Sequence, residues 1–187
     1  MTESKSLVGG VELGGTKCVC IIGTGPDDIR MQVSMPTGND PEATLQQIED
    51  TLRKGTALHG PIKALGIASF GPVDLAQSSR TFGYITSTPK PGWRGTPVAT
   101  RLQRAFPVPL GFDTDVSAAA LAEGRWGAAR DLTDFAYITV GTGIGVGLIV
   151  RGRPARGFTH SELGHIRIVR AAGDAWPGVC VFHGDCI

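Results

Sequence analysis

Two glycine-rich turns are the parts of this sequence that could bind an anion. The first is GGVELGGTK, residues 9–17, and the second is GTGIGVG, residues 141–147. Glycine lets backbone N–H groups converge on an anion without interference from side chains, so either turn could cradle phosphate oxygens. Glycine-rich hairpins are also common without a ligand, so each turn alone is equally well explained as a tight hairpin. The presence of two such turns in one chain favours phosphate binding.

Neither turn fits the common nucleotide-binding motifs. Gly10 and Gly15 have the G-x4-G spacing of a P-loop, but Thr-Lys follows in place of Lys-Ser/Thr, and a predicted strand comes next instead of a helix. In the second turn, Val146 or Leu148 stands where the Rossmann fingerprint needs its third glycine. Any phosphate site in this chain is therefore of another kind.

An acidic stretch, GFDTDVSAAALAE, lies between the two turns at residues 111–123. It places Asp115 at the end of an apolar strand and the start of a predicted helix, where α/β sheets bind ligands. A helix cap alone would contribute about 1 kcal/mol, yet two acids and two hydroxyls occur here within five residues. Phosphoryl transfer to an alcohol needs a carboxylate that accepts the hydroxyl proton. Spacing alone does not separate such a base from a cap.

Potential metal ligands are concentrated near the end of the chain. Cys180, His183 and Cys186 fall within seven residues, and His165 lies upstream. Two thiolates and two imidazoles form a tetrahedral set that suits Zn²⁺. The spacing differs from that of the common zinc fingers, so incidental thiols are the alternative.

The other cysteines and histidines have structural interpretations. Cys18 and Cys20 are two residues apart in a predicted strand, so they point to one face and are expected in the core. His59, in a His-Gly-Pro turn after the first predicted helix, and His160 are both expected to be solvated.

An α/β architecture must position these residues. Strands are predicted at residues 7–12, 17–23, 30–34, 64–69 and 108–112, and as a pair within 135–150. Helices are predicted at residues 41–54, 96–106 and 117–126. Asp40 is the expected cap of the first helix and Gly55 its expected stop, while residues 79–95 read as an irregular surface loop. The second hairpin looks like the start of a second lobe.

Composition excludes several classes of protein. The 187 residues include 18 basic and 17 acidic side chains, so no general attraction to nucleic acid or anionic membrane is expected. The 27 glycines do not recur every third residue, which excludes collagen. Residues 1–5 are polar and do not form a signal peptide, and no apolar run approaches the roughly 20 residues of a membrane helix. Cytoplasm is the expected location.

Seven motifs, in this order, carry a resemblance to a known family: GGVELGGTK, GIASFGPVD, GYITSTPKPGW, DTDVSAAALAEGRWGA, TVGTGIGVG, GRPARGFTHSELGHI and CVFHGDC. Together they resemble the ROK family of sugar kinases, most closely its fructokinase branch, from residue 8 to the end. The resemblance implies the actin-like ATPase (ribonuclease H-like) fold, with a complete first lobe at residues 1–113 and the beginning of the second at residues 114–187. It also implies ATP, a hexose (most closely fructose), Mg²⁺ and Zn²⁺ as ligands.

The resemblance assigns roles residue by residue. Asp115 matches the catalytic base that deprotonates the sugar hydroxyl. The positions matched to ATP and Mg²⁺ are Glu12, Gly14, Gly15, Thr16, Lys17, Gly141, Thr142 and Gly143. Those matched to the sugar are Thr114, Ser117, Glu162 and His165, and those matched to zinc are His165, Cys180, His183 and Cys186. Ser117 departs from the family pattern, in which Asn is usual, and the shorter Ser can leave a sugar hydroxyl without its partner.

Two alternatives stand beside a hexose kinase. The family also contains sugar-responsive repressors, but eight residues precede Gly9, too few for a helix-turn-helix. Family members continue well past the zinc cluster, so a truncated, non-catalytic fragment that binds sugar or zinc without turnover is the second alternative. Family members are often dimers, so a homodimer is one candidate, but the sequence leaves the oligomeric state open; no nucleic-acid or membrane partner is expected.

Overall fold

The computed structural model describes residues 6–141, 143–157 and 159–186, and the chain divides into two compact units, Met1–Asp115 (unit 1) and Val116–Ile187 (unit 2). The strands of unit 1 are β1 Val8–Leu13, β2 Lys17–Gly25, β3 Asp28–Pro36, β4 Leu65–Ser69 and β5 Leu110–Thr114, and its helices are α1 Pro41–His59 and α2 Val98–Ala105. Helix α3 spans Asp115–Trp126, and unit 2 continues with β6 Phe135–Val140, β7 Ile144–Val150, β8 Arg153–Pro154 and the 3-10 helix η1 Leu163–His165. Every predicted helix and strand is present, which confirms the α/β interpretation; β8 and η1 were not predicted.

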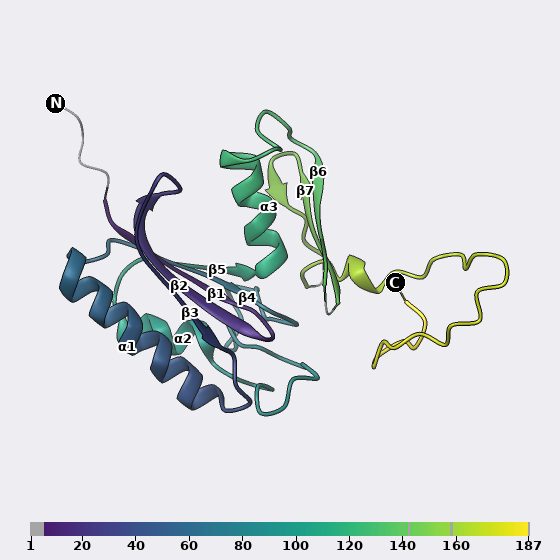
Figure 1. The fold of residues 1–187 in the computed structure, drawn as a ribbon, viewed down its shortest axis with the longest axis horizontal. Helices are drawn as coiled ribbons and strands as arrows, with labels where there is room; N and C mark the ends of the chain where they lie inside the picture. Colours follow the sequence, from purple (N-terminus) through teal and green to yellow (C-terminus); the bar gives the residue numbers. More distant parts are fainter. Residues whose placement is uncertain (1–5, 142, 158, 187) are drawn as a thin grey trace. The chain divides into compact units, whose positions relative to one another are not determined.

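The sheet of unit 1 has the strand order β3-β2-β1-β4-β5. Strands β1, β4 and β5 are parallel, whereas β2 runs antiparallel to both β1 and β3. Helices α1 and α2 cover one face of this sheet (Figure 1). The carboxyl ends of β1, β4 and β5 therefore meet the start of β2 and the end of β3 at one edge, which we call the carboxyl edge.

The core of unit 1 lies between the sheet and its two helices. The β1–β2 hairpin places alternate side chains inward, including the fully buried Leu13, Cys18, Cys20 and Ile22. Helix α1 contributes Leu45, Ile48 and Leu52 to the same core, and these side chains are at most 2% exposed. Each such side chain contributes about 1.5–3 kcal/mol through burial. The expected core position of both cysteines is confirmed, and their mutual hydrogen bond, with burial, raises the pKa of the Cys18 thiol.

Helix α1 does not stop at Gly55, and that prediction is wrong. The helix continues to His59 and ends at Gly60, whose φ is +106°. A Cβ atom on Gly55 would lie 2.6 Å from both Ile22 Cδ1 and Met31 Sδ. Glycine is needed at this position because the helix approaches the sheet closely there, and its helix-breaking tendency is overridden by packing. His59, expected in a solvated turn, is instead a half-buried helical residue.

The beginnings of the helices agree with the predicted signals to within two residues. The Asp40 side chain accepts a hydrogen bond from the Ala43 N–H at 3.2 Å, so it caps α1 as expected. Helix α3 begins at Asp115 rather than at Ser117, and α2 is shorter than predicted. Among the described residues, no helix is both long and apolar enough to cross a lipid bilayer.

The sheet of unit 2 has the strand order β6-β7-β8 and is antiparallel. Helix α3 packs closely on β7, because a Cβ atom on Gly145 would lie 2.7 Å from Val116 Cγ1 and one on Gly147 only 2.1 Å from Val116 O. These two glycines of the second turn motif therefore serve helix–strand packing. After η1, residues 166–186 contain no helix or strand and follow an extended course (Figure 1).

The loop between β4 and α2 is held together by the carboxylate of Asp74. Asp74 accepts hydrogen bonds from Ser79 Oγ at 2.5 Å, from Thr81 Oγ1 at 2.7 Å and from the Ala76 N–H at 3.0 Å. The hydrogen bonds from Ser79 and Thr81 hold the pKa of Asp74 below its usual value. The ionised carboxylate is thus the form that stabilises the loop.

We expect Asp74→Asn to lower the free energy of unfolding by about 1 kcal/mol at neutral pH, since an amide accepts these bonds less strongly. A carboxyl whose pKa is depressed by folding stabilises the protein above its unfolded pKa, and this contribution is lost as the pH falls through the folded pKa. The difference between the two proteins should therefore shrink towards about pH 2.5. Urea denaturation at neutral pH and at about pH 2.5 measures this difference in unfolding free energy. The exposed Asp27→Asn is the control, and an Asp74→Asn deficit that did not change with pH would contradict the prediction.

Candidate functional site

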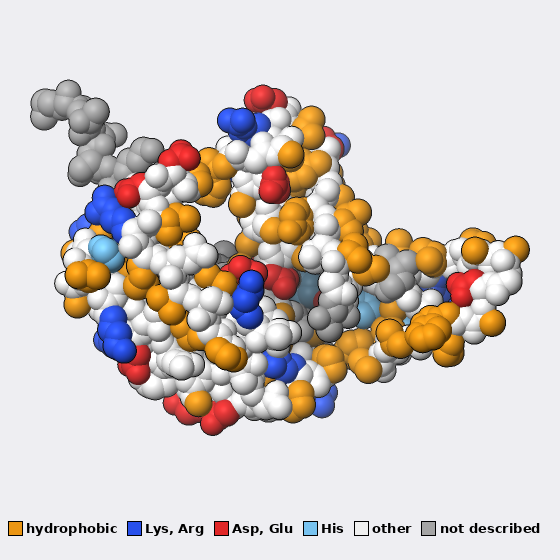
Figure 2. Space-filling model, viewed as in Figure 1, with side chains coloured by type: hydrophobic (Ala, Val, Ile, Leu, Met, Phe, Trp, Pro, Cys, Tyr) orange, Lys and Arg blue, Asp and Glu red, His pale blue; other side chains and the backbone are white. Residues whose placement is uncertain are grey.

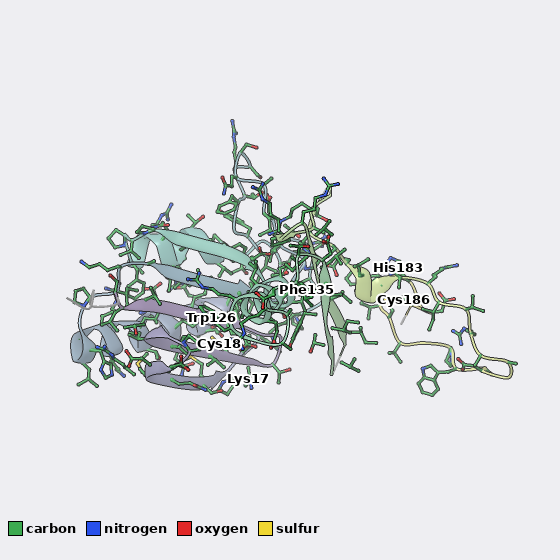
Figure 3. The ribbon with its side chains drawn as sticks, turned by 90° about the horizontal axis from the view of Figure 1, so that it is seen from above. Lys17, Cys18, Trp126, Phe135, His183 and Cys186 are labelled. Carbon is green, nitrogen blue, oxygen red and sulfur yellow. The ribbon has the colours of Figure 1, made fainter. Side chains whose placement is uncertain are left out.

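The carboxyl edge of unit 1 gathers most of the residues to which the sequence assigns phosphate and base chemistry. Glu12, near the end of β1, pairs in register with Ala68 of β4, and Ser69 pairs with Thr114 at the end of β5. The first glycine turn, Gly14–Thr16, joins β1 to β2 at this edge, and Lys17 begins β2 (Figure 3). Asp115 follows Thr114 directly. The fold thus brings an acid, a glycine turn and the expected base to one place.

The first glycine turn is a closed turn with open space at Gly15. It is closed by a hydrogen bond of 3.0 Å from the Gly14 N–H to Lys17 O. A Cβ atom on Gly14 would lie 2.8 Å from Lys17 O, whereas one on Gly15 would meet nothing within 4 Å. Gly14 is therefore required by the turn itself, and Gly15 leaves open space beside backbone N–H groups. Gly15, Thr16 and Lys17 are all exposed, so a phosphate can reach them.

The junction of β5 and α3 presents Asp115 at a helix N-terminus. Asp115 is the first residue of α3 and is half-buried. The backbone N–H groups of a first helical turn favour negative charge nearby. The preceding Thr114 is 4% exposed, and its N–H donates to Asp113 Oδ1 at 2.7 Å. The carboxylate of Asp115 is thus carried by a helix start that is anchored at the end of the sheet.

In unit 2, the second glycine turn lies next to η1. The turn is closed by a hydrogen bond of 2.9 Å from the Gly141 N–H to Gly143 O, and added Cβ atoms on both glycines would meet nothing. Thr142 lies outside the described residues. A Cβ atom on Gly164 would lie 1.9 Å from Ile144 O, so η1 contacts the start of β7 directly after the turn. Unit 2 thus brings a second open glycine turn and the segment 162–165 together.

The Glu162 side chain lies between two histidines. Its Oε1 is 3.4 Å from Nδ1 of His160, and its Oε2 is 3.9 Å from Nε2 of His165. His160 is 7% exposed, so the expectation that it is solvated is wrong. Folding buries it beside a carboxylate, an arrangement that the local sequence did not indicate. Ser117, the other expected sugar-binding residue of unit 2, is 4% exposed in the first turn of α3.

His165, Cys180, His183 and Cys186 converge on one point. One potential ligand atom from each residue lies within 4.8 Å of all the others. His165 Nδ1 is 3.3 Å from Cys186 Sγ and 3.4 Å from Cys180 Sγ, and Cys180 Sγ is 3.8 Å from His183 Nδ1. Ligand atoms bound to one tetrahedral zinc ion are about 3.5 Å apart, so the four residues, which we call the zinc cluster, fit such an ion. Figure 3 shows two of them, His183 and Cys186, near η1.

The protonation of the zinc cluster also suits a metal. The hydrogen bond with Cys186 lowers the pKa of Cys180 to about 6 and raises that of Cys186. The thiolate is the form of cysteine that binds metal. His165 turns Nδ1 to the sulfurs and Nε2 to Glu162, and a carboxylate on the second ring nitrogen is the usual support of a metal-binding histidine.

The sequence missed a contact between the loop at residues 79–95 and the carboxyl edge. Lys90 Nζ donates to Thr37 O at 3.1 Å, and the two residues are 53 positions apart in the chain. The motif that contains Lys90, TPKPGW, was noted from the sequence but interpreted as surface loop. Its apolar Trp93, followed by a helix, was the only local signal that the loop is anchored.

Comparison with known proteins gives a family match. The model of the ROK family matches residues 8–187. A curated relative, the putative fructokinase of Bacillus subtilis (strain 168), is 43% identical over 180 residues, which cover 96% of this chain and 58% of the relative. The chain thus spans less than two thirds of the relative's length.

Two solved structures resemble the chain. The ROK hexokinase from Thermus thermophilus matches with a TM-score of 0.75 and 30% identity, over 96% of this chain and 58% of that one. The ROK family glucokinase from Streptomyces griseus, solved in complex with glucose and AMPPNP, matches with a TM-score of 0.73 and 29% identity, over 87% of this chain and 51% of that one. The actin-like ATPase fold expected from the sequence is confirmed for the amino-terminal part of that fold.

Proposed function

The chain belongs to the ROK family, and from this premise we propose that it phosphorylates a hexose, most closely fructose, at the expense of ATP. The observation that carries the proposal is the gathering of Glu12, the first glycine turn and Asp115 at the carboxyl edge. The similarity to a putative fructokinase and to a glucokinase solved with glucose and AMPPNP supports it.

Asp115 is the proposed general base. Its carboxylate accepts the proton of the sugar hydroxyl that attacks the terminal phosphate, and the helix start holds it in place. The open space at Gly15 lets backbone N–H groups bind phosphate oxygens, with the exposed Lys17 as an added positive charge. Gly141 and Gly143 are the proposed second phosphate contact.

Glu12 is the proposed acid at the magnesium site. Magnesium is bound in kinases through one or two carboxylates together with substrate phosphates and water, and the exposed Glu12 beside the first turn fits that arrangement. When bound, Mg²⁺ neutralises charge on the transferred phosphate. Thr114, Ser117, Glu162 and His165 are the proposed sugar contacts. A cytoplasmic homodimer without nucleic-acid or membrane partners is part of this proposal and rests on the resemblance.

The test is a coupled assay of ADP release with fructose, glucose and mannose. We expect turnover, with fructose preferred over the other two sugars. Protein carrying Asp115→Asn, prepared in the same way, controls for contaminating kinases. Calorimetric titration with each sugar runs in parallel. Absence of turnover on all three hexoses, with sugar binding retained, would reject kinase activity for this chain.

Binding of a hexose or zinc without turnover is the second candidate function, and the surface of unit 2 favours it. Large apolar side chains are exposed there, along β6 and along the segment after η1, where Figure 2 shows apolar atoms at the surface: Ile138, Val140, Val169, Trp176, Val181 and Phe182. Apolar surface of this kind usually marks an interface. Turnover would then require further polypeptide on this surface, and the assay above separates the two candidates.

A further inference from the structure

The segment Thr88–Trp93 lies directly on the turn Pro36–Asp40. Trp93 is fully buried, and its indole N–H donates to Gly38 O at 2.8 Å. Gly92 has a φ of +81°, and a Cβ atom there would lie 2.2 Å from Asn39 O. The two segments are thus in backbone contact, although they are more than 50 residues apart in the chain.

The Pro36–Asp40 segment is also hydrogen-bonded to the first glycine turn. Pro36 pairs with Lys17 in the β2–β3 register, and the Thr37 N–H donates to Thr16 O at 2.9 Å. On the other side of the same residue, Thr37 O accepts the hydrogen bond from Lys90 Nζ. Thr37 therefore connects the ammonium of Lys90 to the backbone of Thr16 through two hydrogen bonds.

Lys90 carries a charge without an ionic partner, and Thr37 carries a hydroxyl without a hydrogen-bond partner, among the described residues. Within the described chain, no carboxylate lies at ion-pair distance from the ammonium of the half-buried Lys90, which donates to the neutral Thr37 O. Thr37 is 6% exposed, and its Oγ1 has no hydrogen-bond partner in the part of the chain that the structure describes. An unpaired buried hydroxyl such as that of Thr37 costs about 1–3 kcal/mol. A bound anion would compensate the ammonium.

We propose that Lys90 is a positioning residue for the nucleotide: it holds the first glycine turn in place through Thr37 and supplies positive charge for the bound polyphosphate. This rests on the proposed function, since it assigns a further residue to the same phosphate site. We assign Lys90 to ATP rather than to the sugar for two reasons. Its positive charge complements a polyphosphate, and Thr37 connects it to Thr16 of the first glycine turn.

The test compares Lys90→Met, which keeps the aliphatic chain and loses the ammonium, with Lys90→Arg, which keeps charge and donors. For Lys90→Met we expect the KM for ATP to rise about tenfold, with kcat and the KM for fructose within about twofold. Lys90→Arg should restore most of the ATP affinity. Lys63→Met is the matched control, because Lys63 is exposed just before β4, at the opposite edge of the same sheet.

Calorimetric titration with ATP and with tripolyphosphate separates this inference from the proposed function, because neither measurement needs turnover. Weakened binding of both ligands by Lys90→Met supports the inference even if no hexose is phosphorylated. Three results overturn it: a rise in the KM for fructose alone, unchanged ATP affinity in the variant, or no ATP binding by the parent. A lower melting temperature with unchanged ATP affinity would likewise reduce Lys90 to a structural role.

Discussion

The Asp115→Asn variant is expected to lose about a hundredfold to ten-thousandfold in kcat while it binds fructose within about twofold of the parent. Asn has nearly the same shape and can still lie at the start of α3, but its amide does not accept a proton from the sugar hydroxyl. The loss should therefore fall on the chemical step. Initial rates of ADP release and calorimetric titration with fructose measure the two quantities on the same preparations.

Asp113→Asn is the matched control for this prediction. Asp113 lies two residues before Asp115 in β5 and accepts the Thr114 N–H. Asn keeps a carbonyl oxygen that can accept the same bond, so the variant tests disturbance of the strand–helix junction. It should retain most of the parental kcat. Equal activity of Asp115→Asn and parent, or an equal loss in both variants, would remove Asp115 as the base.

The elements of the fold could be predicted because their signals are local. The inward side chains of β1 and β2 alternate, and Leu45, Ile48 and Leu52 recur at helical spacing, so hydrophobic periodicity was sufficient. The end of α1 was misjudged because Gly55 has a tertiary role. The missing Cβ of Gly55 matters because Ile22 and Met31 of the sheet lie against it in the fold. A pattern of neighbouring residues in the sequence does not contain this contact.

The candidate site could be predicted in part for a related reason. The alternating glycines at 141–147 look alike in sequence. In the structure, Gly141 and Gly143 have open space beside them, whereas Gly145 and Gly147 allow α3 to pack closely on β7. Only the packed structure separates glycines with open space beside them from glycines required by packing. Lys90 was missed because its partner is 53 residues away, and sequence spacing says nothing about such a contact.

Cys180→Ala is expected to remove zinc from the protein and to destabilise unit 2 selectively. Cys180 Sγ contacts all three other members of the zinc cluster, and the three remaining ligands should bind zinc at least about a hundredfold more weakly. Residues 166–186 have no helix or strand to hold them, so a bound zinc ion would be a major constraint on them. Bound zinc per chain, measured by elemental analysis after dialysis, should fall from about one to near zero.

Cys20→Ala is the control that separates zinc loss from the loss of a thiol. Cys20 is buried in the core of unit 1, so its replacement should lower the stability of unit 1 by about 1 kcal/mol and leave zinc bound. Hydrogen exchange resolves the two units: Cys180→Ala should raise exchange in residues 163–186 and spare β1 to β5. Parent protein without bound zinc, or Cys180→Ala protein that retains it, would contradict the assignment.

The metal should also affect sugar binding, because His165 belongs both to the zinc cluster and to the proposed sugar contacts. His165 turns Nδ1 to the cysteines and Nε2 to Glu162, so loss of zinc frees the ring and the carboxylate that it supports. Removal of zinc with EDTA, followed by dialysis into buffer that contains Mg²⁺, is therefore expected to weaken fructose binding by about tenfold, and added Zn²⁺ to restore it. Affinity for ATP through the first glycine turn should be unchanged, because that turn belongs to unit 1, whose core forms without the zinc cluster. An equal loss of affinity for fructose and for ATP would mean that zinc stabilises the whole chain. The contact between His165 and Glu162 would then not be the cause of the weaker fructose binding.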